Sequence, residues 1–390
     1  MIATDTDRED EIVLKLLHTA DWHLGKRFPS FPKESAEKLT RARLDAVDRV
    51  LLLAERHAVD AVLCAGDLFD EPCPPALWWE QLAACFQRRA WKSRPVFLLP
   101  GNHDPLIPES IWAEGHKFRR LLPDWVHVVD REDFSFALPG GATLFAVPCA
   151  SKAGQRDPTL AIPRRAPGDS SIRIGLVHGS TFDAPDFQTN FPIAKEAAVE
   201  RGLDYLALGD THGFRFVPPE RREPPTIYPG TPEPTAFDER DPGCAALVLL
   251  DRRRRAQVLP ERVAGYTWED LAVTSLDELR ALAKRHDLGD RVLRLRVEMR
   301  VPARDYDEAE RLLEEIEGTP ARHGKPAVLV LDRHGLELET SSVADYAGDL
   351  PDALRSTVRR LLEAAEKPEQ RLAAERALYH LYRLTRKKAS

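Results

Sequence analysis

The chain has 390 residues, of which 43% are hydrophobic and 31% charged, and its formal net charge is −7. This composition is typical of a globular protein, and the length exceeds the roughly 100–200 residues of one domain, so we expect two or three domains. No run approaches the roughly 18 apolar residues that span a bilayer, and the acidic N-terminus is unlike a secretory signal. These features exclude the membrane and export classes and predict a cytoplasmic protein.

The cysteines are scattered along the chain. The five cysteines have no CxxC pairing, so they fit reduced core residues better than disulfides or a zinc site.

A mildly acidic chain is not an obvious nucleic-acid binder, because duplex affinity comes largely from Lys and Arg that neutralise phosphates. Basic residues nevertheless gather locally, at Arg88-Arg89, Arg119-Arg120, Arg164-Arg165, Arg221-Arg222 and Arg252 to Arg255. Taken singly, each group is typical of a solvated loop or strand edge.

Strands and helices alternate in the first hundred residues. Residues 12–18, 61–65 and 95–99 are short apolar runs typical of buried strands. Between them, apolar residues at helical spacing predict helices over about 36–57 and 75–89. This alternation indicates α/β layering with largely parallel strands.

The middle of the chain is richer in strands. The expected elements are a hairpin over 134–149 and strands over 172–177, 205–208, 225–237 and 244–251. We expect these strands to extend the sheet structure of the first part.

A second architecture begins near residue 270. The run Ser275-Leu276-Asp277-Glu278 is a capping box, which predicts a helix to about His286. Clean alternation over 293–301 predicts a half-buried strand, and a helix at 306–317 and a strand at 327–331 complete a small β-α-β unit. From Pro351 two helical stripes of apolar residues follow. They either pack on the rest of the chain or bind a partner by laying their apolar faces in a groove.

Polar motifs follow five of the predicted strands. They are Asp21-x-His23, Gly66-Asp67, Gly101-Asn102-His103-Asp104, His178-Gly179 and Gly209-Asp210-Thr211-His212. Functional residues of such sheets gather beyond the carboxyl ends of the strands, so all five motifs could converge on one edge. Carboxylates mixed with imidazoles and an amide suit manganese, iron or zinc better than calcium or magnesium. One carboxylate can bridge two cations, and such a pair could activate a water and stabilise a leaving oxygen.

These motifs resemble the signature of the calcineurin-like metallophosphoesterases. Within that superfamily, HTADWHLGK (His18 to Lys26), AGDLFD (Ala65 to Asp70), LPGNHD (Leu99 to Asp104) and YPGTPEPTAF (Tyr228 to Phe237) resemble the DNA repair exonuclease branch, which includes the SbcD-type nuclease subunits of bacteria. The resemblance implies a four-layered α/β/β/α sandwich over 1–265, a capping domain over 266–345 and a helical ATPase-partner-binding segment over 346–390.

The resemblance also implies roles for single residues. Asp21, His23, Asp67 and His212 would hold one divalent cation, and Asp67, Asn102, His178 and Asp210 the other. We expect manganese, with iron, zinc or magnesium as alternatives. His103 would be the catalytic histidine, and Asp104 would either orient it or serve a turn. Many family members have a histidine where this chain has Asp210, a change that favours a harder ion there.

Trp22 lies within the first motif and His18 lies just before it. Trp22 either packs under the site or stacks on a substrate, and packing is favoured. His18, at the end of the first strand, could support the metal ligands from behind.

The function that the resemblance implies is a metal-dependent DNA exonuclease or endonuclease for DNA ends, working as a homodimer with an SMC-like, SbcC-type ATPase. One alternative is a phosphatase or small-nucleotide phosphodiesterase with the same metal site. It would leave about 120 residues of cap and helices without a role. A further alternative is a non-catalytic scaffold, which the intact Asn102-His103 pair disfavours.

Overall fold

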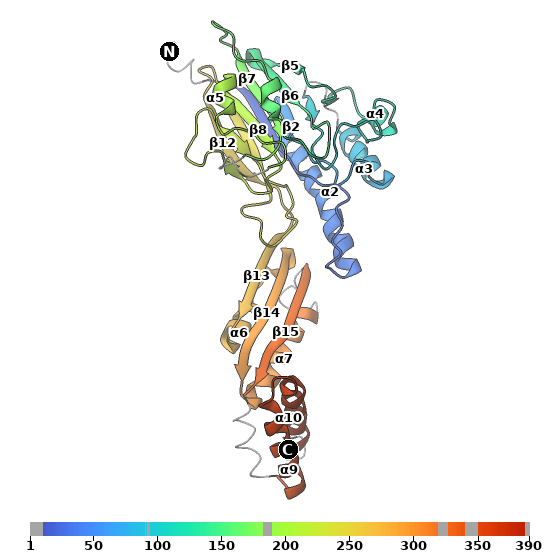
Figure 1. Cartoon of the computed structure of the whole chain (residues 1–390), viewed down its shortest axis with the longest axis vertical. Helices are drawn as coiled ribbons and strands as arrows, with labels where there is room; N and C mark the ends of the chain where they lie inside the picture. The colour runs from blue at the N-terminus through green and yellow to red at the C-terminus, as the bar shows by residue number, and fades with distance from the viewer. Residues whose placement is uncertain are drawn as a thin grey trace. The chain divides into compact units, whose positions relative to one another are not determined.

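The computed structural model describes residues 11–89, 91, 94–181, 189–318, 327–339 and 350–386. The chain divides into two compact units, Met1–Gly265 and Tyr266–Ser390, and Figure 1 traces their elements. The predicted boundary between cap and terminal helices, at residues 345 and 346, lies outside the described residues.

The first sheet of the first unit has six strands in the order β12-β11-β1-β2-β3-β4. Strands β1 to β4 are parallel, whereas β11 runs antiparallel to both β1 and β12. The bounds are β1 Ile12–Thr19, β2 Ala61–Cys64, β3 Val96–Leu98, β4 Val126–Val128, β11 Cys244–Asp251 and β12 Ala256–Arg262.

The second sheet also has six strands, in the order β5-β6-β7-β8-β10-β9. Its central strands β6, β7, β8 and β10 are parallel, and β5 and β9 close its ends in antiparallel pairing. The bounds are β5 Phe134–Leu138, β6 Ala142–Val147, β7 Ile172–His178, β8 Tyr205–Gly209, β9 Arg215–Phe216 and β10 Thr226–Tyr228.

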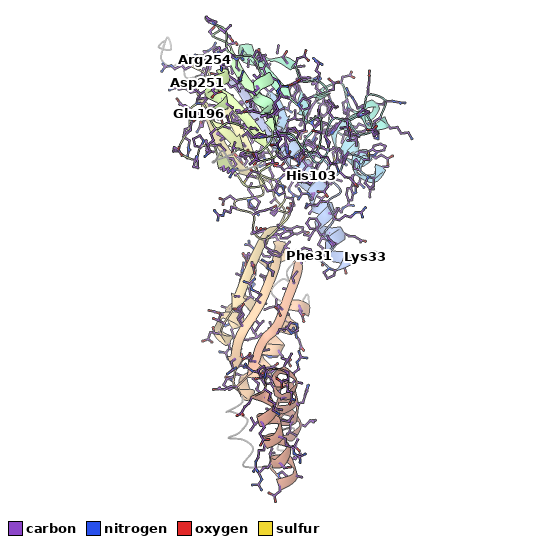
Figure 2. All side chains as sticks on the ribbon, viewed as in Figure 1. Phe31, Lys33, His103, Glu196, Asp251 and Arg254 are labelled. Carbon is purple, nitrogen blue, oxygen red and sulfur yellow. The ribbon has the colours of Figure 1, made fainter. Side chains whose placement is uncertain are left out.

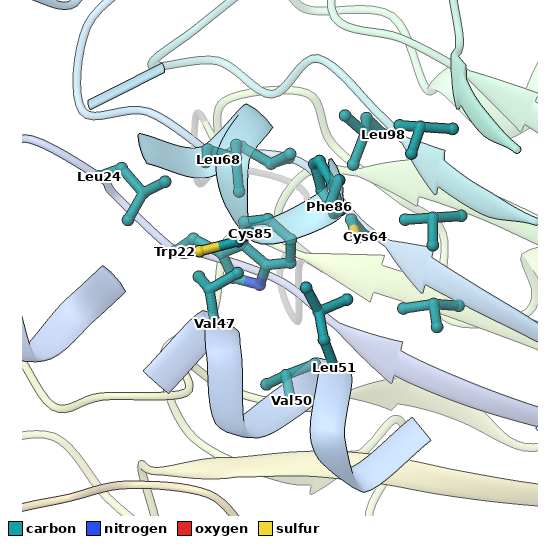
Figure 3. Packing of buried hydrophobic residues seen from close by; sticks show 14 of the residues in the cluster. Trp22, Leu24, Val47, Val50, Leu51, Cys64, Leu68, Cys85, Phe86 and Leu98 are labelled. Carbon is teal, nitrogen blue, oxygen red and sulfur yellow. The ribbon is translucent and has the colours of Figure 1, made fainter. Parts of the chain in front are cut away.

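Neighbouring residues of each strand point into different layers. On β1, Leu16 belongs to the core between the two sheets, in the same buried cluster as Ile174, while Leu17 faces outward. Helices α2 (Lys33–Arg56) and α3 (Ala76–Gln87) cover that outer face. Figure 3 shows part of this layer, with side chains of both helices gathered around Trp22.

The outer face of the second sheet is covered in the same way. Helix α5 (Ala197–Arg201) packs Ala197 and Ala198 against Val177 and Leu206. A short helix, α4 (Lys117–Leu121), adds the buried Phe118 to the core of the first outer layer. The layers are therefore helix, sheet, sheet and helix, which confirms the predicted α/β/β/α sandwich.

The second unit has a parallel sheet of three strands, β13 (Thr267–Val273), β14 (Arg291–Val301) and β15 (Val328–Leu338). Helices α6 (Leu276–Ala283) and α7 (Ala303–Gly318) pack on it. The Ser275 hydroxyl accepts a hydrogen bond from the Glu278 amide at 3.3 Å, so the predicted capping box begins α6.

The last two helices pack within the second unit. Helices α9 (Asp352–Ala365) and α10 (Arg371–Arg386) bury Val358 and Leu378 against Leu338. Leu372 and Leu384 are 41% and 69% exposed. The buried stripe therefore packs on the chain itself, and partner binding by these helices stays a prediction. No helix in the described part of the chain has the length and apolar composition of a membrane span.

Several elements differ from the sequence-based expectation. Of the strand expected over 225–237, only Thr226–Tyr228 pairs in the sheet. The remainder contains Pro229, Pro232 and Pro234, which lack the amide hydrogen that a ladder needs. Strands β4, β9, β12 and β13 were not expected at all. The last two are only partly buried, so they lack the apolar runs that marked the other strands.

A buried arginine joins α2 to two loops of the sandwich. Arg43 is 1% exposed, and its guanidinium donates to the carbonyls of Trp22 (2.7 Å), Glu233 (2.7 Å) and Asp21 (2.9 Å). It also donates to the hydroxyl of Thr231 at 2.9 Å. The loop after β1 and the loop after β10 are therefore tied to one helix side chain.

Replacing Arg43 by leucine should lower the free energy of unfolding of the first unit by about 3 kcal/mol or more, because buried acceptors lose a charged donor. Urea denaturation followed by tryptophan fluorescence measures this, since six of the seven tryptophans lie in that unit. Arg41→Leu, an exposed position on the same helix, is the control and should change stability by less than about 0.5 kcal/mol. Equal stabilities of the two variants would contradict the role given to Arg43.

Candidate metal centre

The five polar motifs follow the carboxyl ends of parallel strands from both sheets. Strands β1, β2 and β3 lead to Asp21, Asp67 and Asn102, and β7 and β8 lead to His178 and Asp210. All the predicted metal ligands therefore lie on one edge of the sandwich.

The opposite edge carries the longest basic run. Because β11 is antiparallel to β1, with Asp251 opposite Ile12, the turn at Arg252 to Arg255 lies at the start of β1. Figure 2 shows His103 well away from Asp251 and Arg254. This run is therefore remote from the candidate site.

Four of the predicted ligands have an unusual backbone conformation. The φ angles of Asp21, His23, Asp67 and Asp210 are 54°, 43°, 54° and 107°. Residues other than glycine rarely adopt such angles. These conformations persist only where the surrounding structure fixes the backbone. Here the Asp21 amide donates to the Gly66 carbonyl at 3.0 Å, and the His23 amide donates to the Asp67 carbonyl at 2.9 Å. These bonds join the loops after β1 and β2.

Two glycines allow the ligand loops to approach each other. Gly66 has a φ of 90°, and a Cβ there would lie 2.3 Å from Nδ1 of His178. A Cβ on Gly101 would lie 2.2 Å from the Asp67 carboxylate. Any larger residue would push the ligands apart, which explains glycine beside them.

The first predicted ligand set comes together in the structure. The Nε2 atoms of His23 and His212 are 3.2 Å apart, and Nε2 of His23 lies 3.7 Å from Oδ2 of Asp67. Ligand atoms of Asp21, His23 and His212 all lie within 4.8 Å of one another.

The second predicted set lies beside the first and shares Asp67. Nε2 of His178 is 2.8 Å from Oδ1 of Asn102, 3.5 Å from Oδ1 of Asp67 and 3.9 Å from Oδ1 of Asp210. The Asp210 amide donates to Oδ1 of Asp21 at 3.0 Å. Asp67 thus faces one histidine with each carboxylate oxygen.

The imidazoles of the three candidate ligand histidines are all oriented in the same sense. Nδ1 of His178 lies 2.8 Å from the Ala65 carbonyl, that of His23 lies 3.2 Å from Oδ1 of Asp70, and that of His212 lies 2.6 Å from Oε1 of Glu239. Each Nδ1 therefore faces an acceptor outside the cluster, and each Nε2 faces into it. Nitrogen and carboxylate donors arranged in this way fit intermediate divalent cations.

Burial and charge shift the pKa values of the cluster in different directions. Burial raises the pKa of Asp21 to about 6 and lowers that of His23 to about 4. Burial also opposes a charge on His178, but the carboxylates of Asp67, Asp21 and Asp210 outweigh it and raise its pKa to about 9. Without a cation, His178 is therefore protonated near neutral pH and carries the charge that the carboxylates need.

His103 lies at the rim of the cluster, with a side chain 43% exposed. Its amide donates to Oδ1 of Asp67 at 2.9 Å, and its Nδ1 lies 3.2 Å from the Asp70 carbonyl. Asp104 instead accepts hydrogen bonds from the amides of Gly101 (2.8 Å) and Phe69 (3.0 Å). Asp104 therefore stabilises a turn and does not orient His103.

The neighbours of the motifs have mostly structural roles. Trp22 is fully buried, as expected for packing, and its indole donates to the Thr19 hydroxyl at 2.9 Å. His18 pairs through Nδ1 with the Tyr205 hydroxyl at 2.8 Å. None of the five cysteines, all within the described residues, forms a disulfide.

Sequence reasoning missed Glu239. It stands 27 residues after His212 and outside every motif, yet its carboxylate meets that imidazole at 2.6 Å. The only local signal was that Glu239 comes two residues after Phe237, the end of the last motif. The sequence pattern did not predict the path of this loop toward His212.

Comparisons with known proteins agree on one family. A model of the calcineurin-like phosphoesterase family matches residues 14–214. The metallophosphoesterase YhaO of Bacillus subtilis is 28% identical over 226 residues, which cover 56% of this chain and 52% of YhaO. The SbcD subunit of the nuclease SbcCD from the same organism is 37% identical over 191 residues, covering 48% of this chain and 42% of SbcD. The chain thus spans about half the length of these two relatives.

A third relative aligns over more of the chain. The DNA double-strand break repair protein Mre11 of Haloferax volcanii is 26% identical over 363 residues, which cover 89% of this chain and 74% of Mre11. This similarity extends beyond residues 14–214, the part that the family model matches.

Cation binding should release protons and should strengthen with pH. Because the pKa of His178 lies near 9, a cation must displace its proton at neutral pH. The apparent affinity for Mn²⁺ should therefore rise, by up to about tenfold per pH unit, from pH 6.5 to pH 8.5. Calorimetric titrations at pH 7.5 in buffers of different ionisation enthalpy should show about one proton released. A pH-independent affinity over this range would contradict the assignment.

Proposed function

The chain belongs to the calcineurin-like phosphoesterase family, and from this premise we propose that it is a metal-dependent DNA nuclease that hydrolyses phosphodiesters at DNA ends. The observation that carries the proposal is an exposed histidine, His103, beside a buried cluster of carboxylates and imidazoles shared around Asp67. Relatives named as nuclease and as double-strand break repair proteins support DNA as the substrate.

Two cation positions are proposed from the two ligand sets. Asp21, His23, Asp67 and His212 would hold one cation, and Asn102, His178 and Asp210 would hold the other together with Asp67. Bound cations, for which Mn²⁺ is the first choice, would activate a water and neutralise charge on the phosphoryl oxygens. The mixture of oxygen and nitrogen donors supports manganese, iron or zinc, and the carboxylate of Asp210 favours the harder of these ions.

His103 is the proposed proton donor. A carbonyl oxygen can only accept, so the contact with Asp70 requires a proton on Nδ1 and leaves Nε2 for the substrate. In its charged form, the imidazole would give the Nε2 proton to the leaving oxygen of the cleaved phosphodiester. Its exposure lets a long polymer reach it without entering the core.

Partners and location complete the proposal. The SbcCD relative is named as one subunit of a nuclease, which supports a second subunit, for which we propose an SMC-like ATPase of the SbcC type. We further propose a homodimer in the cytoplasm. Light scattering on the purified chain would test the dimer, and co-purification with the ATPase would test the partner.

Asp67→Ala should abolish cleavage because it removes the carboxylate shared by both cation positions. The wild type with Mn²⁺ should shorten an end-labelled duplex, and the variant should show no product above background. Asp133→Ala, an exposed carboxylate whose side chain is 90% accessible, is the matched control and should cleave normally. Cleavage of a small phosphodiester without any DNA cleavage, alone or with the ATPase, would overturn the nuclease proposal and favour the small-substrate phosphodiesterase.

His103→Gln should separate chemistry from cation binding. The rate of cleavage should fall about 10²–10⁴-fold, as expected for loss of a proton donor. The number of bound Mn²⁺ ions and their affinity should stay near the wild-type values, measured by calorimetry. An unchanged cleavage rate would contradict the role of His103, and lost cation binding would identify His103 as a ligand instead.

A further inference from the structure

The carboxylate of Glu239 is held in place against one candidate ligand. Its Oε1 lies 2.6 Å from Nδ1 of His212, and its side chain is 9% exposed. Its Oε2 accepts from the amide of Thr235 at 2.8 Å, and the hydroxyl of Thr235 donates to Oε1. Three donors thus fix the carboxylate before any cation binds.

The backbone of the same region is fixed as well. The Thr231 amide donates to the His212 carbonyl at 3.0 Å, and the Thr231 hydroxyl accepts from Arg43. His212 is therefore joined to the loop after β10 at its main chain through Thr231 and at its side chain through Glu239. This arrangement determines both where the imidazole sits and how it is rotated.

We propose that Glu239 is a positioning residue, which fixes the tautomer and orientation of His212 so that its Nε2 can bind a cation. An ionised carboxylate can only accept a hydrogen bond, so the neutral imidazole must carry its proton on Nδ1. The other nitrogen, Nε2, lies 3.2 Å from Nε2 of His23, and its lone pair is available to a cation once neither nitrogen carries the proton of that contact. The inference rests on the metal site of the proposed function and deepens it.

The group that contacts Nδ1 is charged in His212 and neutral in His178. His178 has a neutral backbone carbonyl, that of Ala65, behind its Nδ1. A carboxylate in that position makes the imidazole a stronger donor to a cation, and loss of such a partner costs about 10–100-fold in metal affinity. The cation held by His212 should therefore depend on Glu239 more than the cation held by His178 does.

The test compares Mn²⁺ binding in Glu239→Gln, Glu239→Ala and the wild type by calorimetry without DNA. The affinity of one of two binding steps should fall about 10–100-fold in Glu239→Ala and less in Glu239→Gln, whose amide oxygen can still accept from Nδ1. Asp238→Asn removes the same charge from the neighbouring, exposed position and should leave both steps unchanged.

A second measurement reports the tautomer without any cation. In the metal-free wild type with ¹⁵N-labelled histidine, the His212 signals, assigned by their loss in His212→Asn, should show a proton on Nδ1. In Glu239→Ala they should show a mixture of tautomers. A merely structural role would lower the melting temperature without moving either the tautomer or the affinity.

The outcomes separate the two proposals. Unchanged Mn²⁺ affinity and an unchanged tautomer in both Glu239 variants would overturn the positioning role and leave the nuclease proposal standing. A wild type that binds none of Mn²⁺, Fe²⁺ and Zn²⁺ would overturn both. Weakened binding in Asp238→Asn as well would attribute the effect to charge in the loop and would also overturn the specific role of Glu239.

Discussion

The burial of one carboxylate, Asp67, is the constraint on which the arrangement of this molecule depends. It is 3% exposed at the meeting point of two sheets, with an imidazole facing each of its oxygens. An isolated ion in such a place would cost several kcal/mol, so its surroundings must supply opposite charge. The loops after β1, β3, β7 and β8 all bring polar groups to this point, and the sandwich holds them there.

This requirement changes how the charge of the chain should be understood. The formal −7 counts Asp21, Asp67 and Asp210 as surface charges like any others. In the folded protein they lie together at one edge, where two divalent cations would add about four positive charges. The long arginine run lies at the other edge and does not compensate them. A sum over the sequence therefore says little about which face can approach a polyanion.

Much of the sandwich was predictable, because buried parallel strands are short apolar runs and their motifs come directly after them. Strands such as Ala61–Cys64 and the candidate ligand Asp67 could be found in this way. Arg43 and Glu239 could not, because their partners lie up to 190 residues away and no local pattern encodes such contacts. Half-exposed strands such as Ala256–Arg262 were missed because their pairing depends on neighbours in the sheet.

The positive φ angles of Asp21, His23, Asp67 and Asp210 limit which side chains these positions accept without backbone strain. Aspartate, asparagine and histidine tolerate such angles better than other side chains, and all three also bind cations. Glutamate and cysteine fit these backbone angles less well. Glutamate also has a longer side chain, and cysteine has a softer ligand atom. Asp210 belongs to this small set. The main chain thus favours side chains of hard or intermediate ligand character at these four positions.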